Sequence, residues 1–113
     1  MSHQPNKSCD VLCVAEELIR ALRPIVSACD ADLANQLRRA ATSAALNAAE
    51  AWRRAGRDRA MRLRVAHAEC HEAVAAIRVA VAWGYVADAD AALALHTADR
   101  LGAMLYRLRV PRS

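Results

Sequence analysis

The sequence predicts an all-α protein, specifically an antiparallel four-helix bundle, and three observations carry this prediction. Alanine, which loses no side-chain entropy in a helix, accounts for 28 of the 113 residues. Glycine and proline, which a strand-rich fold needs for its turns, occur only three times each. Four segments place apolar residues at helical spacing with short connections between them, so successive helices should lie side by side.

The first predicted helix runs from Asp10 to Ala28. Asp10 is a favourable N-cap, and apolar residues follow it at intervals of three or four positions. Pro24 lies inside this pattern, and we expect it to kink or interrupt the helix because proline has no amide hydrogen to donate.

Turn and capping residues mark the second helix. It is expected to begin at Asp30 or Asp32 and to last to about Ala55. Gly56 should end it, because glycine is favoured just after a helix, and Asp58 should cap the helix that follows.

Two more helices complete the bundle. The third is predicted over residues 59–83 and should end at Gly84. Asp88 is expected to cap the fourth, over residues 89–108, and Pro111 should stop it.

The chain is predicted to form one folded domain with two short flanking segments. Residues 1–8 are polar and are expected to be a flexible arm, residues 9–110 the bundle, and residues 111–113 a tail. No stretch approaches the roughly 20 apolar residues of a membrane span, and no secretory signal precedes the first helix. We therefore expect a cytoplasmic protein with no membrane partner and with free thiols.

Positive charge is concentrated in the middle of the chain. The net charge is +4, and 15 of the 16 basic residues are arginine. Residues 38–64 hold eight arginines against two carboxylates. Because guanidinium groups bind phosphates in a forked geometry, this segment predicts a surface for RNA or DNA, with a merely solvated face as the alternative. The candidate phosphate-binding residues are Arg38, Arg39, Arg53, Arg54, Arg57, Arg59, Arg62 and Arg64.

The third helix carries two apolar stripes on nearly opposite sides. One should face the bundle core, and the other would stay uncovered in a single chain. A second copy of the chain is the simplest partner, which predicts a homo-oligomer. Glu72, inside the second stripe, either pairs with a cation or reaches solvent in a groove. The predicted interface residues are Met61, Val65, Ala68, Glu72, Val79 and Trp83.

No residue pattern indicates catalysis or a cofactor. Glycine-rich phosphate loops and Glu-x-x-His pairs are absent, and Ser43 has no neighbouring base, so we expect a non-enzymatic protein. His67, Cys70 and His71 are metal-compatible ligands within one turn, but no second ligand pair accompanies them. A structural role is favoured, and a metal site is the alternative.

Trp52 and Tyr106 each have arginine neighbours. Mixtures of aromatic and basic residues favour single-stranded nucleic acid, because bases stack on the rings. For Trp52 we favour packing in the core or at an interface.

Residues 33–86 contain a series of polar positions at defined intervals. The matching residues are Gln36, Leu37, Arg38, Arg39, Ala40, Ala41, Thr42, Ser43, Asn47, Ala48, Ala49, Glu50, either Arg53 or Arg54, Ala66, Glu72, Trp83, Gly84, Tyr85 and Val86. This pattern resembles the bacterial four-helix-bundle family of proteins encoded in intervening sequences of 23S rRNA genes, which includes the accessory variability protein of diversity-generating retroelements. Ala45, Ala51 and the pair Glu69-Cys70 depart from it, standing where relatives usually have Pro, Gly and Gly-Ser. We therefore expect a straighter second helix and a less close helix contact at Cys70.

The resemblance implies a homopentameric barrel, open along its axis, with basic surfaces. The retroelement member of the family is taken to bind nucleic acid and its partner reverse transcriptase without catalysis, whereas many other relatives have no assigned role. Ser43, Asn47 and Glu50 match family positions on one helix face, which we interpret as a helix-packing hydrogen-bond network. A structural or protein-binding module without a nucleic-acid role is the alternative function. The family-motif residues are Gln36, Arg39, Ser43, Asn47, Glu50, Glu72, Gly84 and Tyr85.

Overall fold

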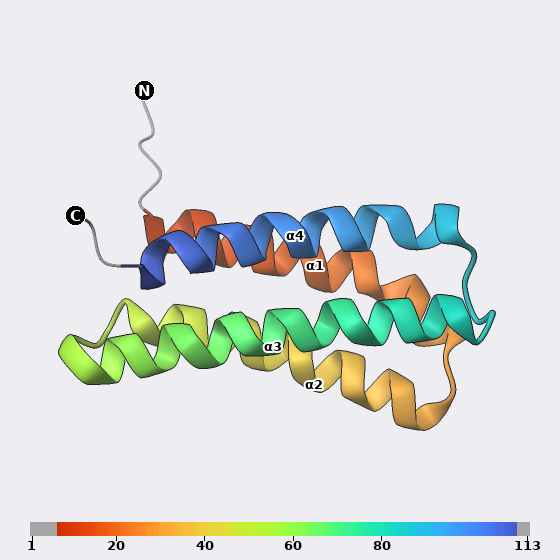
Figure 1. Ribbon diagram of the computed structural model, residues 1–113, viewed down its shortest axis with the longest axis horizontal. Helices are drawn as coiled ribbons and strands as arrows, with labels where there is room; N and C mark the ends of the chain where they lie inside the picture. The colour runs from red at the N-terminus through yellow and green to blue at the C-terminus, as the bar shows by residue number, and fades with distance from the viewer. Residues whose placement is uncertain (1–6, 111–113) are drawn as a thin grey trace.

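The computed structural model describes residues 7–110 and contains helices and no strands over that range (Figure 1). Helix α1 spans Lys7–Ala28, α2 spans Ala31–Ala51, α3 spans Gly56–Ala82 and α4 spans Asp88–Arg109. Each helix packs against its neighbours in sequence, and α4 closes the bundle by packing against α1. This confirms the predicted four-helix bundle. The predicted tail and most of the predicted arm lie outside the described residues, and α1 begins at Lys7, inside the segment expected to be an arm.

Small side chains bring α2 and α3 together. Seven of the eight buried residues of α2 are alanines, and Leu37 is the eighth. Alanines on α3 meet them: Ala66, Ala73, Ala76 and Ala80 are all buried. Larger side chains fill the centre of the bundle. The most completely buried of these are Leu18, Ile25, Leu37, Leu63, Ile77, Leu101 and Leu105.

Helix α1 continues through Pro24 as one helix, so of the two expected effects, a kink or an interruption, the interruption is wrong. Pro24 lies on the exposed side of the helix. The carbonyl that loses its amide partner there is on the outer side, where water can satisfy it.

Helix α2 starts as predicted and ends earlier than predicted. The Asp30 side chain caps it by accepting a 3.1 Å hydrogen bond from the Leu33 amide. The helix stops at Ala51 rather than near residue 55, and Gly56 instead opens α3 with a φ of +58°. Glycine is more common just after a helix than at its start, so the position of Gly56 departs from the usual signal, and this makes the boundary hard to predict from sequence.

The other helix ends give one confirmation and two corrections. Gly84, with a φ of +79°, follows α3 as predicted. Asp58 lies in the first turn of α3 rather than capping it, and the N-cap is Ala55 without a side-chain hydrogen bond. Asp88 is likewise the first residue of α4, after Ala87 as N-cap. Carboxylates in a first turn still stabilise the helix through its dipole.

No helix among residues 7–110 combines the length and hydropathy needed to cross a membrane.

Candidate nucleic-acid interface

Two polar side chains of α2 connect this helix to α3. Asn47 Nδ2 donates to the Ser43 carbonyl at 2.9 Å and to Ser43 Oγ at 3.1 Å. Arg62 on α3 donates from Nη1 to Asn47 Oδ1 at 3.2 Å, so both ends of the Asn47 amide are used. These contacts agree with the interpretation of a helix-packing network. Glu50, expected on the same face, accepts hydrogen bonds from Arg54 instead.

Asp58 holds two of the predicted phosphate-binding arginines in ion pairs. Arg54 Nη1 lies 2.9 Å from Asp58 Oδ2, and Arg54 Nη2 lies 3.0 Å from Glu50 Oε1. Arg62 Nε lies 3.9 Å from Asp58 Oδ1. Glu50, through its hydrogen bond, and then Asp58 raise the pKa of Arg54. A phosphate would have to displace these carboxylates to reach either arginine.

Arg59 stacks on Trp52 at the end of α2. Its guanidinium carbon lies 5.6 Å from the centre of the Trp52 ring, which is the range of a cation–π contact. The ring is half-buried, and Trp52 Nε1 has no hydrogen-bond partner in the described structure. Trp52 is thus engaged in packing, in agreement with the favoured interpretation. Tyr106 is exposed on α4.

Arg39 and Glu72 form an ion pair at the outer edge of the α2–α3 contact. Arg39 Nη2 lies 3.9 Å from Glu72 Oε2, and this oxygen is buried without a hydrogen bond among the described residues. Both alternatives for Glu72 therefore hold in part, because the side chain is paired and also lines a groove. Other residues that line this groove include Leu33, Gln36, Val79, Trp83 and Tyr85.

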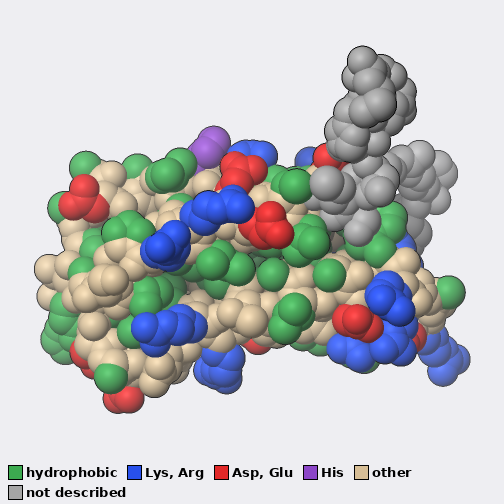
Figure 2. Space-filling view, turned by 180° about the vertical axis from the view of Figure 1, so that it is seen from behind, with side chains coloured by type: hydrophobic (Ala, Val, Ile, Leu, Met, Phe, Trp, Pro, Cys, Tyr) green, Lys and Arg blue, Asp and Glu red, His purple; other side chains and the backbone are tan. Residues whose placement is uncertain are grey.

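Four of the eight arginines are exposed and form no ion pair within residues 7–110. One is Arg38, and the other three are Arg53, Arg57 and Arg64. These last three lie in the α2–α3 connection and the first turns of α3, at the end of the bundle where α4 finishes (Figure 1). We call Arg53, Arg57, Arg64, Arg107 and Arg109 the basic end. Figure 2 shows basic side chains gathered at this end, at right, with carboxylates among them.

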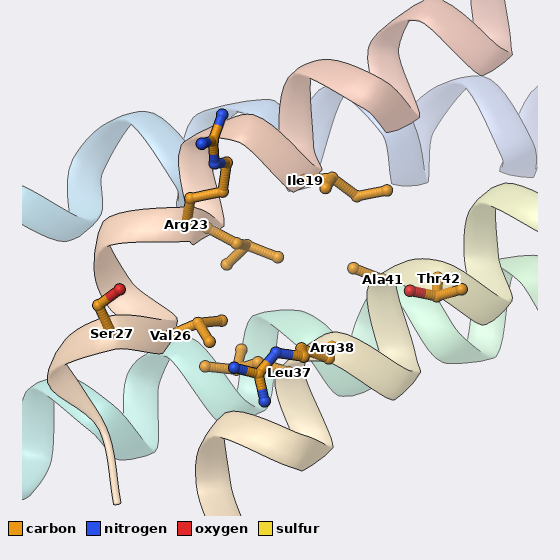
Figure 3. A pocket seen from close by; sticks show the side chains of 9 residues that line it. Ile19, Arg23, Val26, Ser27, Leu37, Arg38, Ala41 and Thr42 are labelled. Atoms are coloured by element: carbon orange, nitrogen blue, oxygen red, sulfur yellow. The ribbon is translucent and has the colours of Figure 1, made fainter. Parts of the chain in front are cut away.

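Arg38 lies apart from the other predicted phosphate ligands. It borders a groove between α1 and α2, across from Arg23, with Val26 and Ala41 among the apolar residues between them (Figure 3). Arg38 Nη1 donates to Asn35 Oδ1 at 3.2 Å. Although Arg38 precedes Arg39, the helical turn of about 100° per residue places it toward α1 rather than α3. The eight arginines therefore do not form one continuous surface.

The second apolar stripe of α3 is left partly uncovered by the other residues of the range 7–110. Met61, Val79 and Trp83 are 38%, 43% and 71% exposed, Ala68 is also exposed and Val65 is half-buried. We call these five residues the outer face of α3. The sequence predicted such an uncovered stripe, and the partner that would cover it remains a prediction.

The structure separates the three candidate metal ligands. Cys70 is buried, and its Sγ donates to the Ala98 carbonyl at 3.2 Å. Burial, with a smaller contribution from Asp99, raises the pKa of Cys70 to about 11, so the thiol stays protonated. His67 and His71 face each other instead, with their Nε2 atoms 3.1 Å apart. No group of three or more metal-ligand side chains occurs within the described part of the chain.

A protein-family model described as 23S rRNA-intervening sequence protein matches residues 10–107, which include nearly all of the four helices. The chain belongs to the 23S rRNA-intervening sequence protein family. This confirms the resemblance drawn from the polar positions of α2 and α3. No curated protein and no solved structure matches this family member significantly.

In this family member, two features of the interface escaped the sequence analysis. One is the chain of ion pairs from Glu50 through Arg54 and Asp58 to Arg62. The four-residue spacing of these charges was a usable signal, although the helix break after Ala51 obscured it. The other is the contact between Arg109 and His67, which joins positions 42 residues apart and left no local signal.

Proposed function

We propose that this 23S rRNA-intervening sequence protein is a non-enzymatic bundle that assembles with copies of itself and binds RNA or DNA through its basic end. The observation that carries the proposal is the set of unpaired arginines around the α2–α3 connection, Arg53, Arg57 and Arg64. Their guanidinium groups are exposed and have no carboxylate to displace, so phosphates can replace water around them directly.

Self-assembly is supported by the outer face of α3. Apolar side chains exposed toward both ends of α3 raise the free energy of a single chain in water, and a second copy of the chain would cover them. We propose a pentamer, as the family resemblance implies. In a ring, each basic end would be repeated around one rim, which would strengthen the field that attracts a polyanion.

A more specific form of the proposal is an accessory role beside a retroelement reverse transcriptase. The support is the family membership together with the basic end, which could hold a template while another surface holds the polymerase. A neighbouring polymerase gene and template repeat, followed by co-purification of the two proteins, would test it. A genome without them would contradict this form alone.

The nucleic-acid role is tested by charge reversal with a matched control. Arg53→Glu with Arg57→Glu should weaken binding of a mixed-sequence oligonucleotide pool by about tenfold or more, measured by fluorescence anisotropy. Arg23→Glu with Arg78→Glu makes the same charge change at exposed residues away from the basic end and should have a much smaller effect. Affinity of the parent should fall steeply between about 50 and about 200 mM salt.

Binding that ignores salt, or that both reversals weaken equally, would contradict the nucleic-acid role. The exposure of Trp83 then favours the second candidate, a protein-interaction module that uses the outer face of α3. In that case both double variants would assemble and capture partners like the parent.

A further inference from the structure

His67 and His71 lie one turn apart on the side of α3 that faces α4. Their Nε2 atoms are 3.1 Å apart, and their rings meet edge to face with centroids 4.7 Å apart. Both rings line a groove between the two helices, with Asp99 and Tyr106 of α4 on its other side. The two Nε2 atoms therefore lie close together beside this groove.

Arg109 determines which nitrogen of His67 carries the proton. Arg109 Nη1 lies 2.6 Å from His67 Nδ1, and a guanidinium group has donors only, so Nδ1 must accept. The proton of neutral His67 is then on Nε2, from which it is donated to Nε2 of His71. Desolvation lowers the pKa of His67, a positive charge on His71, when that ring is protonated, lowers it further, and Arg109 adds to the effect, so His67 is favoured in its neutral form.

We propose that His67 and His71 form a bidentate site for a divalent transition-metal ion, with both Nε2 atoms as ligands and water completing the coordination. Imidazole nitrogen suits Zn²⁺, Ni²⁺ and Cu²⁺. Metal–nitrogen bonds of about 2.0–2.1 Å place two ligand nitrogens about 2.9 Å apart at a right angle and about 3.3 Å apart at the tetrahedral angle. The observed 3.1 Å lies between these values, so the spacing of the two nitrogens suits one ion. The Nε2 proton must leave and each ring must turn its lone pair from the other ring toward the ion.

The site has two protein ligands rather than three. Cys70 is excluded because its thiol is buried and donates to a carbonyl. No third ligand-type side chain within residues 7–110 completes a cluster. The two histidines would therefore chelate the metal ion from a single turn of α3. The affinity for the ion should depend on both histidines about equally.

Metal binding and the Arg109 contact exclude each other. When Nε2 of His67 binds a metal ion, the single proton of the ring moves to Nδ1, where it faces Arg109 Nη1. Two N–H donors cannot remain 2.6 Å apart, so Arg109 must move away. The ion thus replaces a hydrogen bond and releases one guanidinium of the basic end.

The experiment measures Ni²⁺ binding by titration calorimetry on the full chain with His3→Ala, so that a histidine outside the described residues does not contribute. We expect one ion per chain. His67→Ala and His71→Ala should each lower affinity by about tenfold or more. His96→Ala, at an exposed histidine elsewhere on α4, should leave it unchanged, and Arg109→Ala should raise it severalfold. Binding that survives both His67→Ala and His71→Ala would overturn the site.

A second readout needs no substitution in the site. Nuclear magnetic resonance of ¹⁵N-histidine should show His67 changing from the Nε2–H to the Nδ1–H tautomer as Zn²⁺ is added. An unchanged tautomer at saturating Zn²⁺ would overturn the proposal. Neither measurement involves nucleic acid, so the result is independent of the proposed function.

Discussion

Asp58 decides which arginines at the α2–α3 connection are available to a ligand. Its two carboxylate oxygens pair with Arg54 and Arg62, whereas Arg53, Arg57 and Arg64 have no such partner. Counting arginines along the sequence could not separate paired from unpaired ones. The separation depends on the direction of each side chain, which the break between α2 and α3 determines. The charge total was predictable, and its distribution between paired and unpaired groups was not.

Asp58→Asn should therefore increase nucleic-acid affinity. The substitution leaves the side-chain size unchanged and removes the carboxylate that pairs with Arg62 and that shares Arg54 with Glu50. We expect a gain of several fold in anisotropy measurements at low salt. Asp32→Asn makes the same charge change in the first turn of α2, at the other end of the bundle, and should give little gain. Equal gains in affinity for both variants would contradict a specific role for Asp58, because the net charge of the protein would then explain the gain.

Asn47 is expected to stabilise the contact between α2 and α3. Asn47→Ala removes the acceptor of Arg62 and the donor to Ser43, so the free energy of unfolding should fall by about 1 to 2 kcal/mol. Urea denaturation measures this change. Asn35→Ala, which removes only an exposed hydrogen bond to Arg38, should change stability by much less. A similar loss in both variants would contradict a special role for Asn47.

Cys70 should make the protein less stable in alkali. Its pKa is about 11 in the folded state against an ordinary value of 9.0, so the unfolded chain loses the thiol proton first. The resulting stabilisation is complete below pH 9 and is lost as the pH rises toward 11, by about 2 kcal/mol. Denaturation curves of the parent and of Cys70→Ala should converge over this range. Curves that stay parallel would contradict the prediction.

At the scale of helices, hydrophobic spacing predicted the number, order and approximate extent of all four elements. The apolar stripe of α1 indicated the extent of the helix even across Pro24. Tertiary packing of this stripe outweighs the loss of one backbone hydrogen bond at the proline. The ends were less predictable. Gly56 and Asp58 are residue types that occur both just outside a helix and in its first turn. Their positions are determined by packing in the bundle.

Two glycines should respond to alanine with opposite signs. Gly84→Ala forces a side chain into positive φ and should cost about 1 to 2 kcal/mol of stability. Gly102 lies inside α4, where an added Cβ would make an ordinary 3.8 Å contact with Cys70 Sγ. Gly102→Ala should therefore stabilise the protein by about 0.5 to 1 kcal/mol. Thermal unfolding measures both, and a shift of the same sign in the two variants would contradict these assignments.

At the scale of the whole molecule, charge is separated along the bundle axis. The basic end lies opposite the connections that carry Asp30, Asp32, Asp88 and Asp90, the carboxylates that begin α2 and α4. The outer face of α3 runs between these two ends. Sequence analysis predicted the basic segment and the apolar stripe separately, but only the antiparallel order of helices adds Arg107 and Arg109 to the arginines of the α2–α3 connection.

Assembly should depend on the outer face of α3. Val79→Arg places a charge within that face, beside Trp83, and should shift the protein toward single chains in sedimentation velocity at micromolar concentration. Leu93→Arg introduces the same charge at a 67% exposed residue of α4 and should leave assembly unchanged. A parent that sediments as a single chain would contradict the assembly proposal.

The alanine contact between α2 and α3 also sets what the chain can tolerate in evolution. Methyl groups leave no room between the two backbones, so a longer side chain at Ala44 or Ala73 would act as a spacer and push the helices apart. Arg62 would then move out of reach of Asn47, and Glu72 away from Arg39. Variation at these inner positions should be confined to the smallest residues. A larger buried side chain would first disrupt the polar contacts at the surface of the two helices.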